Sequence, residues 1–168
     1  MNYPIEYIRY LAHFHGSRDY FECHEILEEY WKSLSIREDV WVGLIQIAVG
    51  LYHHRRGNVA GSAKMLASAS NRLLAEDVER LGIDYQQLQE TLDQRIQWVR
   101  KQGEYSDLNL PIKDPSLRLM AQEECLKNGW GWQVPSSTDE SLIHRHTLRD
   151  RSDVIREREE KLRMKKHS

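Results

Sequence analysis

Apolar residues recur every three or four positions through most of the first hundred residues, and nearly every such run stops at a glycine. This spacing is typical of amphipathic α-helices, because it gathers the apolar side chains on one face. Glycine commonly ends a helix, so the runs divide this region into helices joined by short connections. Short connections make neighbouring helices antiparallel. The sequence therefore predicts an all-α protein, a compact antiparallel bundle of about five helices with a C-terminal helical appendage.

Capping residues place the ends of these helices. Asp19 can accept a hydrogen bond at the start of the second helix while Glu22, three residues on, reaches back to it, as in a capping box. Asn58 and Asp84 are suited to cap the fourth and fifth helices. The predicted helices cover about residues 5–15, 19–34, 38–56, 58–81 and 84–103.

The character of the chain changes twice after Gly103. Residues 1–103 form the predicted bundle domain, and residues 104–139 read as an irregular segment around a short helix near 116–127. Residues 140–168 form a charged tail, which carries 9 Lys/Arg against 6 Asp/Glu, and a last helix is expected over 140–165. The apolar residues of this helix are sparse, so it is expected to dock on one side or to contact a partner.

Composition excludes several classes of protein. The formal net charge of −2 argues against a chain that coats nucleic acid or an anionic membrane, although the cationic end of the tail could touch RNA weakly. The two cysteines make neither a disulfide framework nor a zinc-knuckle spacing, and no apolar stretch approaches the roughly 20 residues of a membrane span. We expect a cytoplasmic protein with free thiols and no membrane contact.

The second helix concentrates aromatic, histidine and carboxylate side chains. Tyr20, His24 and Trp31 share one stripe, and Glu28 lies four residues beyond His24 on its flank. In an antiparallel pair with the third helix, the numbers of facing residues sum to roughly 72. This register places Gln46 of the third helix beside Glu28. It also places His53, on the same face of the third helix as Gln46, beside Tyr20.

The cluster allows three interpretations. Two imidazoles and a carboxylate, His24, His53 and Glu28, could bind a transition metal, with Glu25 or water completing the shell. The same residues could instead form a satisfied buried network, in which Glu28 holds His24 and Gln46 fixes the helix register. A small-molecule pocket is the third interpretation.

These residues, together with the stretches at 46–53 and 57–61, resemble the small helical proteins of domain-of-unknown-function family 309 over roughly residues 14–75. The resemblance implies a compact α-helical fold and no established activity. Ser62 stands where the family pattern usually has alanine. The family positions that match here are Phe21, Glu22, His24, Glu25, Leu27, Glu28, Trp31, Gln46, His53, Gly57, Asn58 and Gly61.

Two functions follow from these observations. The first is a binding or interaction module that meets an unknown protein partner, or a second copy of itself, through the tail and the segment around Trp130 and Trp132. The second is a metal-dependent hydrolase, with the cluster as metal site and Glu25 as general base. In either case Tyr20, Trp31, Gln46 and Asn58 would line the motif or pocket.

Overall fold

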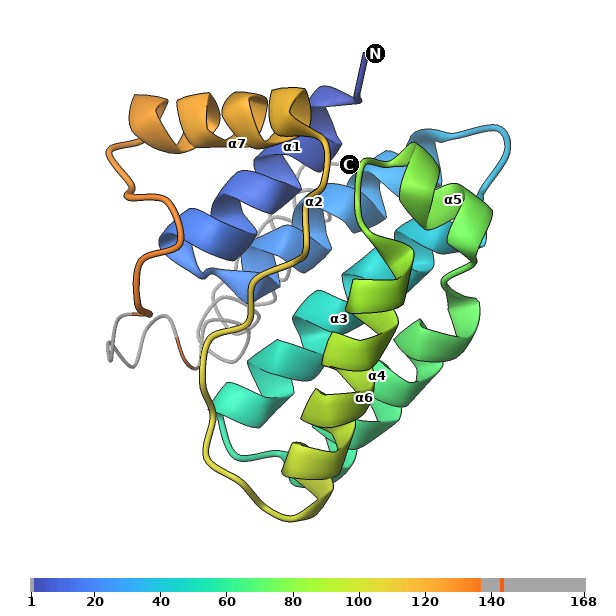
Figure 1. Cartoon of the computed structure of the whole chain (residues 1–168), viewed down its shortest axis with the longest axis vertical. Helices are drawn as coiled ribbons and strands as arrows, with labels where there is room; N and C mark the ends of the chain where they lie inside the picture. Colours follow the sequence, from blue (N-terminus) through green and yellow to red (C-terminus); the bar gives the residue numbers. More distant parts are fainter. Residues whose placement is uncertain (1, 137–142, 144–168) are drawn as a thin grey trace, which may run out of the picture. The chain divides into compact units, whose positions relative to one another are not determined.

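The structure is a computed structural model that describes residues 2–136 and residue 143. Within these residues the chain forms seven α-helices and one π-helix and no β-strand, which confirms the all-α prediction (Figure 1). The helix expected over 140–165 lies outside the described residues. The elements are α1 (Ile5–Ala12), the π-helix η1 (His13–Ser17), α2 (Tyr20–Ser33), α3 (Asp39–Arg55), α4 (Val59–Arg72), α5 (Ala75–Arg80), α6 (Tyr85–Arg100) and α7 (Pro115–Lys127).

Helix α3 is the centre of the fold. It packs between α2 and α4; α6 packs on α4, and α1 packs on both α2 and α7 (Figure 1). Most apolar side chains of α3 are buried, among them Leu44, Ile47 and Leu51, as expected for a helix that contacts others on several sides. Within the described residues, no helix combines the length and apolar character needed to cross a bilayer.

The expected capping bonds from the side chains of Asp19, Asn58 and Asp84 are present, whereas the Asp19 amide, expected to pair with Glu22, donates to the Ser17 hydroxyl at 3.2 Å. The carboxylate of Asp19 accepts the Glu22 amide, the side-chain oxygen of Asn58 accepts the Gly61 amide, and Asp84 accepts the amide three residues on, each at 3.0 Å. Each bond satisfies an amide that has no partner within its helix. The beginnings of α2, α4 and α6 are therefore fixed by local sequence.

The fourth predicted helix differs from the structure, because it is broken into α4 and α5. Leu73 and Leu74, between these helices, have extended backbone angles. The Leu73 side chain is buried, and a Cβ added to Gly43 of α3 would come within 2.7 Å of it. Leu73 thus occupies space that the glycine leaves open, and its burial competes with continuation of the helix.

A buried arginine joins the N-terminal helices to the segments that follow α6. Arg18, which has a left-handed backbone (φ +57°), is 2% exposed. Its guanidinium donates to the carbonyls of Val134 at 2.9 Å, Leu108 at 3.0 Å and Phe14 at 3.3 Å. The carboxylate of Asp107 lies 3.9 Å from its Nε. The positive charge is thus held among oxygen atoms in the protein interior.

Two further chains of hydrogen bonds complete this region, which we call the Arg18 clasp: His15, Arg18, Tyr20, Tyr105 and Asp107. The Tyr20 hydroxyl lies 2.6 Å from that of Tyr105, which donates to Asp107 at 2.7 Å. His15 Nδ1 lies 2.9 Å from the Leu11 carbonyl, and His15 Nε2 accepts the Leu110 amide at 3.0 Å. Burial lowers the pKa of His15 to about 3, so the ring is neutral at pH 7.

Candidate functional site

The motif of α2 presents a short polar row at the surface. His24 Nε2 lies 2.5 Å from a carboxylate oxygen of Glu28, whose other oxygen is 2.9 Å from Lys32 Nζ. The hydrogen bond from Lys32 lowers the pKa of Glu28, and the neighbouring His24 lowers it further. Both side chains of the His24–Glu28 pair remain partly open, at 28% and 34% exposed. The carboxylate is therefore ionised and shared between two donors at the protein surface.

The α2–α3 pair has the antiparallel register expected from the sequence. The rings of Phe21 and Tyr52, whose numbers sum to 73, have centroids 5.9 Å apart, and Arg55 donates to the Arg18 carbonyl at 2.8 Å. The buried Gln46 Oε1 has no hydrogen-bond partner among the described residues, and the same holds for Trp31 Nε1. Gln46 therefore does not contact the Glu28 carboxylate through this oxygen.

The second histidine of the predicted metal set, His53, lies near the end of α3. His53 Nδ1 lies 3.4 Å from the Asn58 amide nitrogen, at the junction of α3 and α4. Glu25 lies on an exposed part of α2. Among the described residues, no three His, Cys, Asp or Glu side chains come close enough together to hold a metal ion. The assignment of His24, Glu28 and His53 to a metal, with Glu25 as base, stays a prediction.

Two groups of aromatic residues that the sequence analysis connected with a site or a partner pack within the chain. Tyr20 is fully buried, and its hydroxyl is part of the Arg18 clasp. The ring of Trp130 lies 4.6 Å from that of His13, and Trp132 lies 4.6 Å from His15. Both tryptophans therefore cover the π-helix of their own chain.

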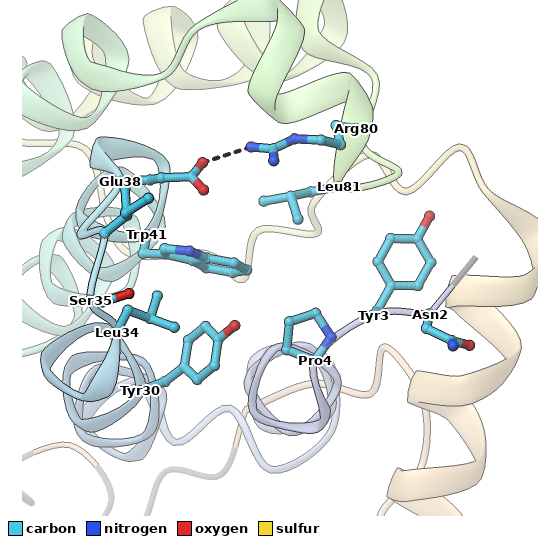
Figure 2. A pocket seen from close by; sticks show the side chains of 11 residues that line it. Asn2, Tyr3, Pro4, Tyr30, Leu34, Ser35, Glu38, Trp41, Arg80 and Leu81 are labelled. Atoms are coloured by element: carbon cyan, nitrogen blue, oxygen red, sulfur yellow. Dashed lines mark hydrogen bonds and ion pairs between the residues drawn. The ribbon is translucent and has the colours of Figure 1, made fainter.

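A cavity of about 400 Å³ lies where the N-terminal segment, the α2–α3 connection and the end of α5 meet (Figure 2). We call it the Trp41 pocket. Trp41 is 6% exposed, and its indole is perpendicular to the Tyr30 ring, with centroids 5.1 Å apart and an interplanar angle of 87°. Ile36, 77% exposed, stands at the edge of the pocket. The apolar and aromatic wall consists of Tyr3, Pro4, Tyr30, Leu34, Trp41 and Leu81.

The polar groups of the Trp41 pocket are few and well defined. Arg80 donates to Glu38 at 2.8 Å and to Asp77 at 3.1 Å, and the Arg80–Glu38 pair closes one side of the pocket (Figure 2). The Tyr30 hydroxyl has no hydrogen-bond partner among the residues that the structure describes. Burial raises the pKa of Tyr30, and the nearby carboxylates of Glu6 and Glu38 raise it further. An apolar pocket with a few polar groups at fixed positions is the usual form of a small-molecule site.

The sequence analysis missed this pocket, although one signal for it was available. Tyr30 and Trp41 have numbers that sum to 71, so the predicted register already places the two rings opposite each other. The contributions of Tyr3 and Leu81 had no such signal, because their approach depends on packing between segments that are far apart in the sequence.

Comparisons with known proteins support the resemblance seen in the sequence. A family model described as "Domain of unknown function (DUF309)" matches residues 7–65. A Bacillus subtilis (strain 168) protein described as "Uncharacterized protein YpuF" is 47% identical over 171 residues, which cover 99% of this chain and 98% of that protein. No solved structure matches the chain. The matched segment 7–65 contains the His24–Glu28 row and the Tyr30–Trp41 wall, whereas Arg80 and Leu81 lie beyond it.

Proposed function

We propose, on the premise that this chain belongs to the family described as "Domain of unknown function (DUF309)", that it is a binding module whose ligand places an apolar group in the Trp41 pocket. The observation that carries the proposal is the pocket itself: about 400 Å³ in volume and walled by tyrosine, tryptophan, leucine and proline side chains. A ligand that enters it covers apolar surface that the chain leaves open, and such burial contributes most of the affinity of small ligands.

A small neutral probe tests the proposal. 3,3-Dimethyl-1-butanol carries one compact apolar group and no charge, and its seven non-hydrogen atoms should give a dissociation constant on the order of 1 mM. In a titration of the full chain followed by NMR, we expect the side-chain resonances of Trp41 and Tyr30 to shift saturably.

A matched pair of variants locates the binding. Ser35 lines the pocket and Ser33, two residues earlier, does not. Ser35→Trp should obstruct the pocket and weaken the response, whereas Ser33→Trp should leave it unchanged. Absence of any shift at Trp41 and Tyr30 at about 50 mM probe, some 50 times the expected dissociation constant, would contradict the proposal.

The metal-dependent hydrolase is the second candidate, and one contact favours it. His24 and Glu28, two of its three proposed ligands, already touch at 2.5 Å. Elemental analysis of untagged protein purified without chelator, compared with the His24→Ala/His53→Ala variant, decides between the two functions. Near-stoichiometric metal that disappears in the double variant would favour the hydrolase, and equal low metal in both proteins would favour the binding module.

A further inference from the structure

The shape of the Trp41 pocket suggests the kind of group that enters it, an inference that rests on the proposed function. The indole of Trp41 and the ring of Tyr30 form a right-angled corner, and Tyr3 and Pro4 stand across from them (Figure 2). Aromatic faces carry negative electrostatic potential, and tryptophan attracts cations most strongly among the aromatic side chains. Such a corner favours a ligand that is both apolar in surface and positively charged.

The charges around the pocket have the complementary sign. Glu38 lines the pocket, and the carboxylates of Glu38 and of Glu6 on α1 both raise the pKa of Tyr30. Arg80, the one cation among the described residues of the wall, is bound by two carboxylates, those of Glu38 and Asp77. The carboxylates of Glu38, Asp77 and Glu6 thus lie in or near the pocket against one guanidinium, and the field at the pocket is negative. An anionic ligand would meet this field and a guanidinium that already has partners.

We infer that the Trp41 pocket binds a quaternary ammonium group, with the methyl groups against Trp41 and Tyr30 and the charge balanced by Glu38. An alkylated ammonium has the apolar surface that the wall requires and the positive charge that the carboxylates require. It forms no hydrogen bonds through its nitrogen, so the apolar and aromatic part of the wall is sufficient to contact it.

A pair of isosteres separates this inference from the proposed function. Choline and 3,3-dimethyl-1-butanol have nearly the same shape, but only choline is charged. In NMR titrations of the full chain at constant ionic strength, we expect choline to bind roughly tenfold more tightly than the neutral alcohol. Equal or weaker binding of choline would overturn the inference while leaving the proposed function intact. If neither probe binds, the proposed function is wrong as well.

Two neighbouring carboxylates provide a matched pair of variants. Glu38→Gln keeps the shape of a pocket residue and removes its charge, and no capping bond is lost because the Glu38 side chain makes none. Asp39→Asn removes the adjacent charge, whose partner Arg72 is outside the pocket wall. We expect Glu38→Gln to remove most of the tenfold preference for choline and Asp39→Asn to preserve it. A preference that is the same in both variants would overturn the role of Glu38.

The quaternary group could belong to a free small molecule or to a methylated lysine of a polypeptide. An acetylated and amidated tripeptide with a central trimethyllysine distinguishes these sources. Tighter binding of the tripeptide than of choline assigns the group to a polypeptide, and weaker binding assigns it to a free molecule. Failure of both cationic probes to exceed the neutral alcohol would overturn the inference.

Discussion

Tyr20 and Tyr30 lie ten residues apart on the same helix, but their hydroxyl groups have opposite surroundings. The Tyr20 hydroxyl is buried in the Arg18 clasp, 2.6 Å from the Tyr105 hydroxyl. The Tyr30 hydroxyl borders the Trp41 pocket and has no hydrogen-bond partner among the described residues. The Tyr20 hydroxyl, at the start of α2, therefore links distant segments of the chain. The Tyr30 hydroxyl, near the end of α2, can hydrogen-bond to a ligand.

The same contrast applies to the two arginines of these regions. Arg18 is buried and donates to three backbone carbonyls, so its bonds fix segments that are far apart in the sequence. Arg80 forms surface ion pairs with Glu38 and Asp77, and its side chain is 49% exposed. A polar group whose hydrogen bonds are all made within the chain contributes to stability. Polar or aromatic surface that the chain leaves uncovered is available for binding a ligand.

Replacing each arginine by methionine should produce the largest difference between the two regions. Arg18→Met leaves buried carbonyls without donors, and we expect the free energy of unfolding to fall by roughly 3–5 kcal/mol. Arg80→Met removes exposed ion pairs, so we expect a loss of about 1 kcal/mol or less. Urea unfolding of both variants measures the difference. Similar losses would mean that the clasp is not the more strongly stabilised region.

Acidification should weaken the clasp through His15. The folded chain holds the pKa of His15 at about 3, below the ordinary 6.5, so between these values the unfolded chain binds the extra proton. The free energy of unfolding should therefore fall as pH drops from 6.5, by roughly 2–3 kcal/mol at pH 4.5. The pKa of His54 is also lowered by burial and adds to the loss in the same direction.

A His15→Asn variant isolates this contribution. It should be less stable at pH 7, because the bond to the Leu110 amide is lost. Its free energy of unfolding should change less between pH 6.5 and 4.5 than that of the wild type. A pH dependence as steep as the wild type's would mean that His15 is not the group that titrates.

Removing each tyrosine hydroxyl tests whether the Tyr20 and Tyr30 hydroxyl groups contribute differently to stability. Tyr20→Phe takes a hydrogen bond from the partly buried Tyr105 hydroxyl, and we expect a loss of about 1–2 kcal/mol in the free energy of unfolding. Tyr30→Phe removes no hydrogen bond within the described residues, and we expect a change within about 0.5 kcal/mol. Equal losses in chemical denaturation would show that the Tyr30 hydroxyl has a partner in solution.

A small effect is also expected at the motif histidine, His24. The His24–Glu28 pair is about one third exposed and Glu28 keeps Lys32 as a partner, so His24→Ala should lower the free energy of unfolding by about 0.5 kcal/mol. Thermal unfolding should show a shift of ~2 °C. A shift several times larger would mean that His24 is part of the core rather than of a surface row.

Local sequence signals predicted the helices and one register, and they failed where distant segments determine the structure. The caps at Asp19 and Asn58 depend only on nearby residues, and both are present. The helix break at Leu73 was not predicted, because no glycine or proline lies there. Leu73 instead packs against Gly43 of another helix, in the space that a side chain at position 43 would fill. Arg18, between a serine and an aspartate, has the sequence of an exposed turn, but Leu108 and Val134 bury it.

The candidate site divides in the same way. Sequence reasoning identified His24 and Glu28 as neighbours, because residues four apart on a helix meet. It joined His53 to them as well, which stays a prediction; the structure shows His53 near Asn58 and against the Tyr52 ring. The Trp41 pocket depends on Tyr3, Trp41 and Leu81 together, and no spacing in the sequence connects these three positions.

The shortness of α5 has a consequence for how fast the pocket exchanges its contents. This helix has six residues and only Val78 buried, yet its C-terminal end supplies Arg80 and Leu81 to the pocket wall. Segments with so few buried contacts open locally at a small fraction of the free energy of global unfolding. Amide protons of α5 should therefore exchange with solvent well before those of α3. A molecule held against Leu81 would slow that exchange selectively. The residence time of the ligand would then depend on the rate at which one short helix opens locally.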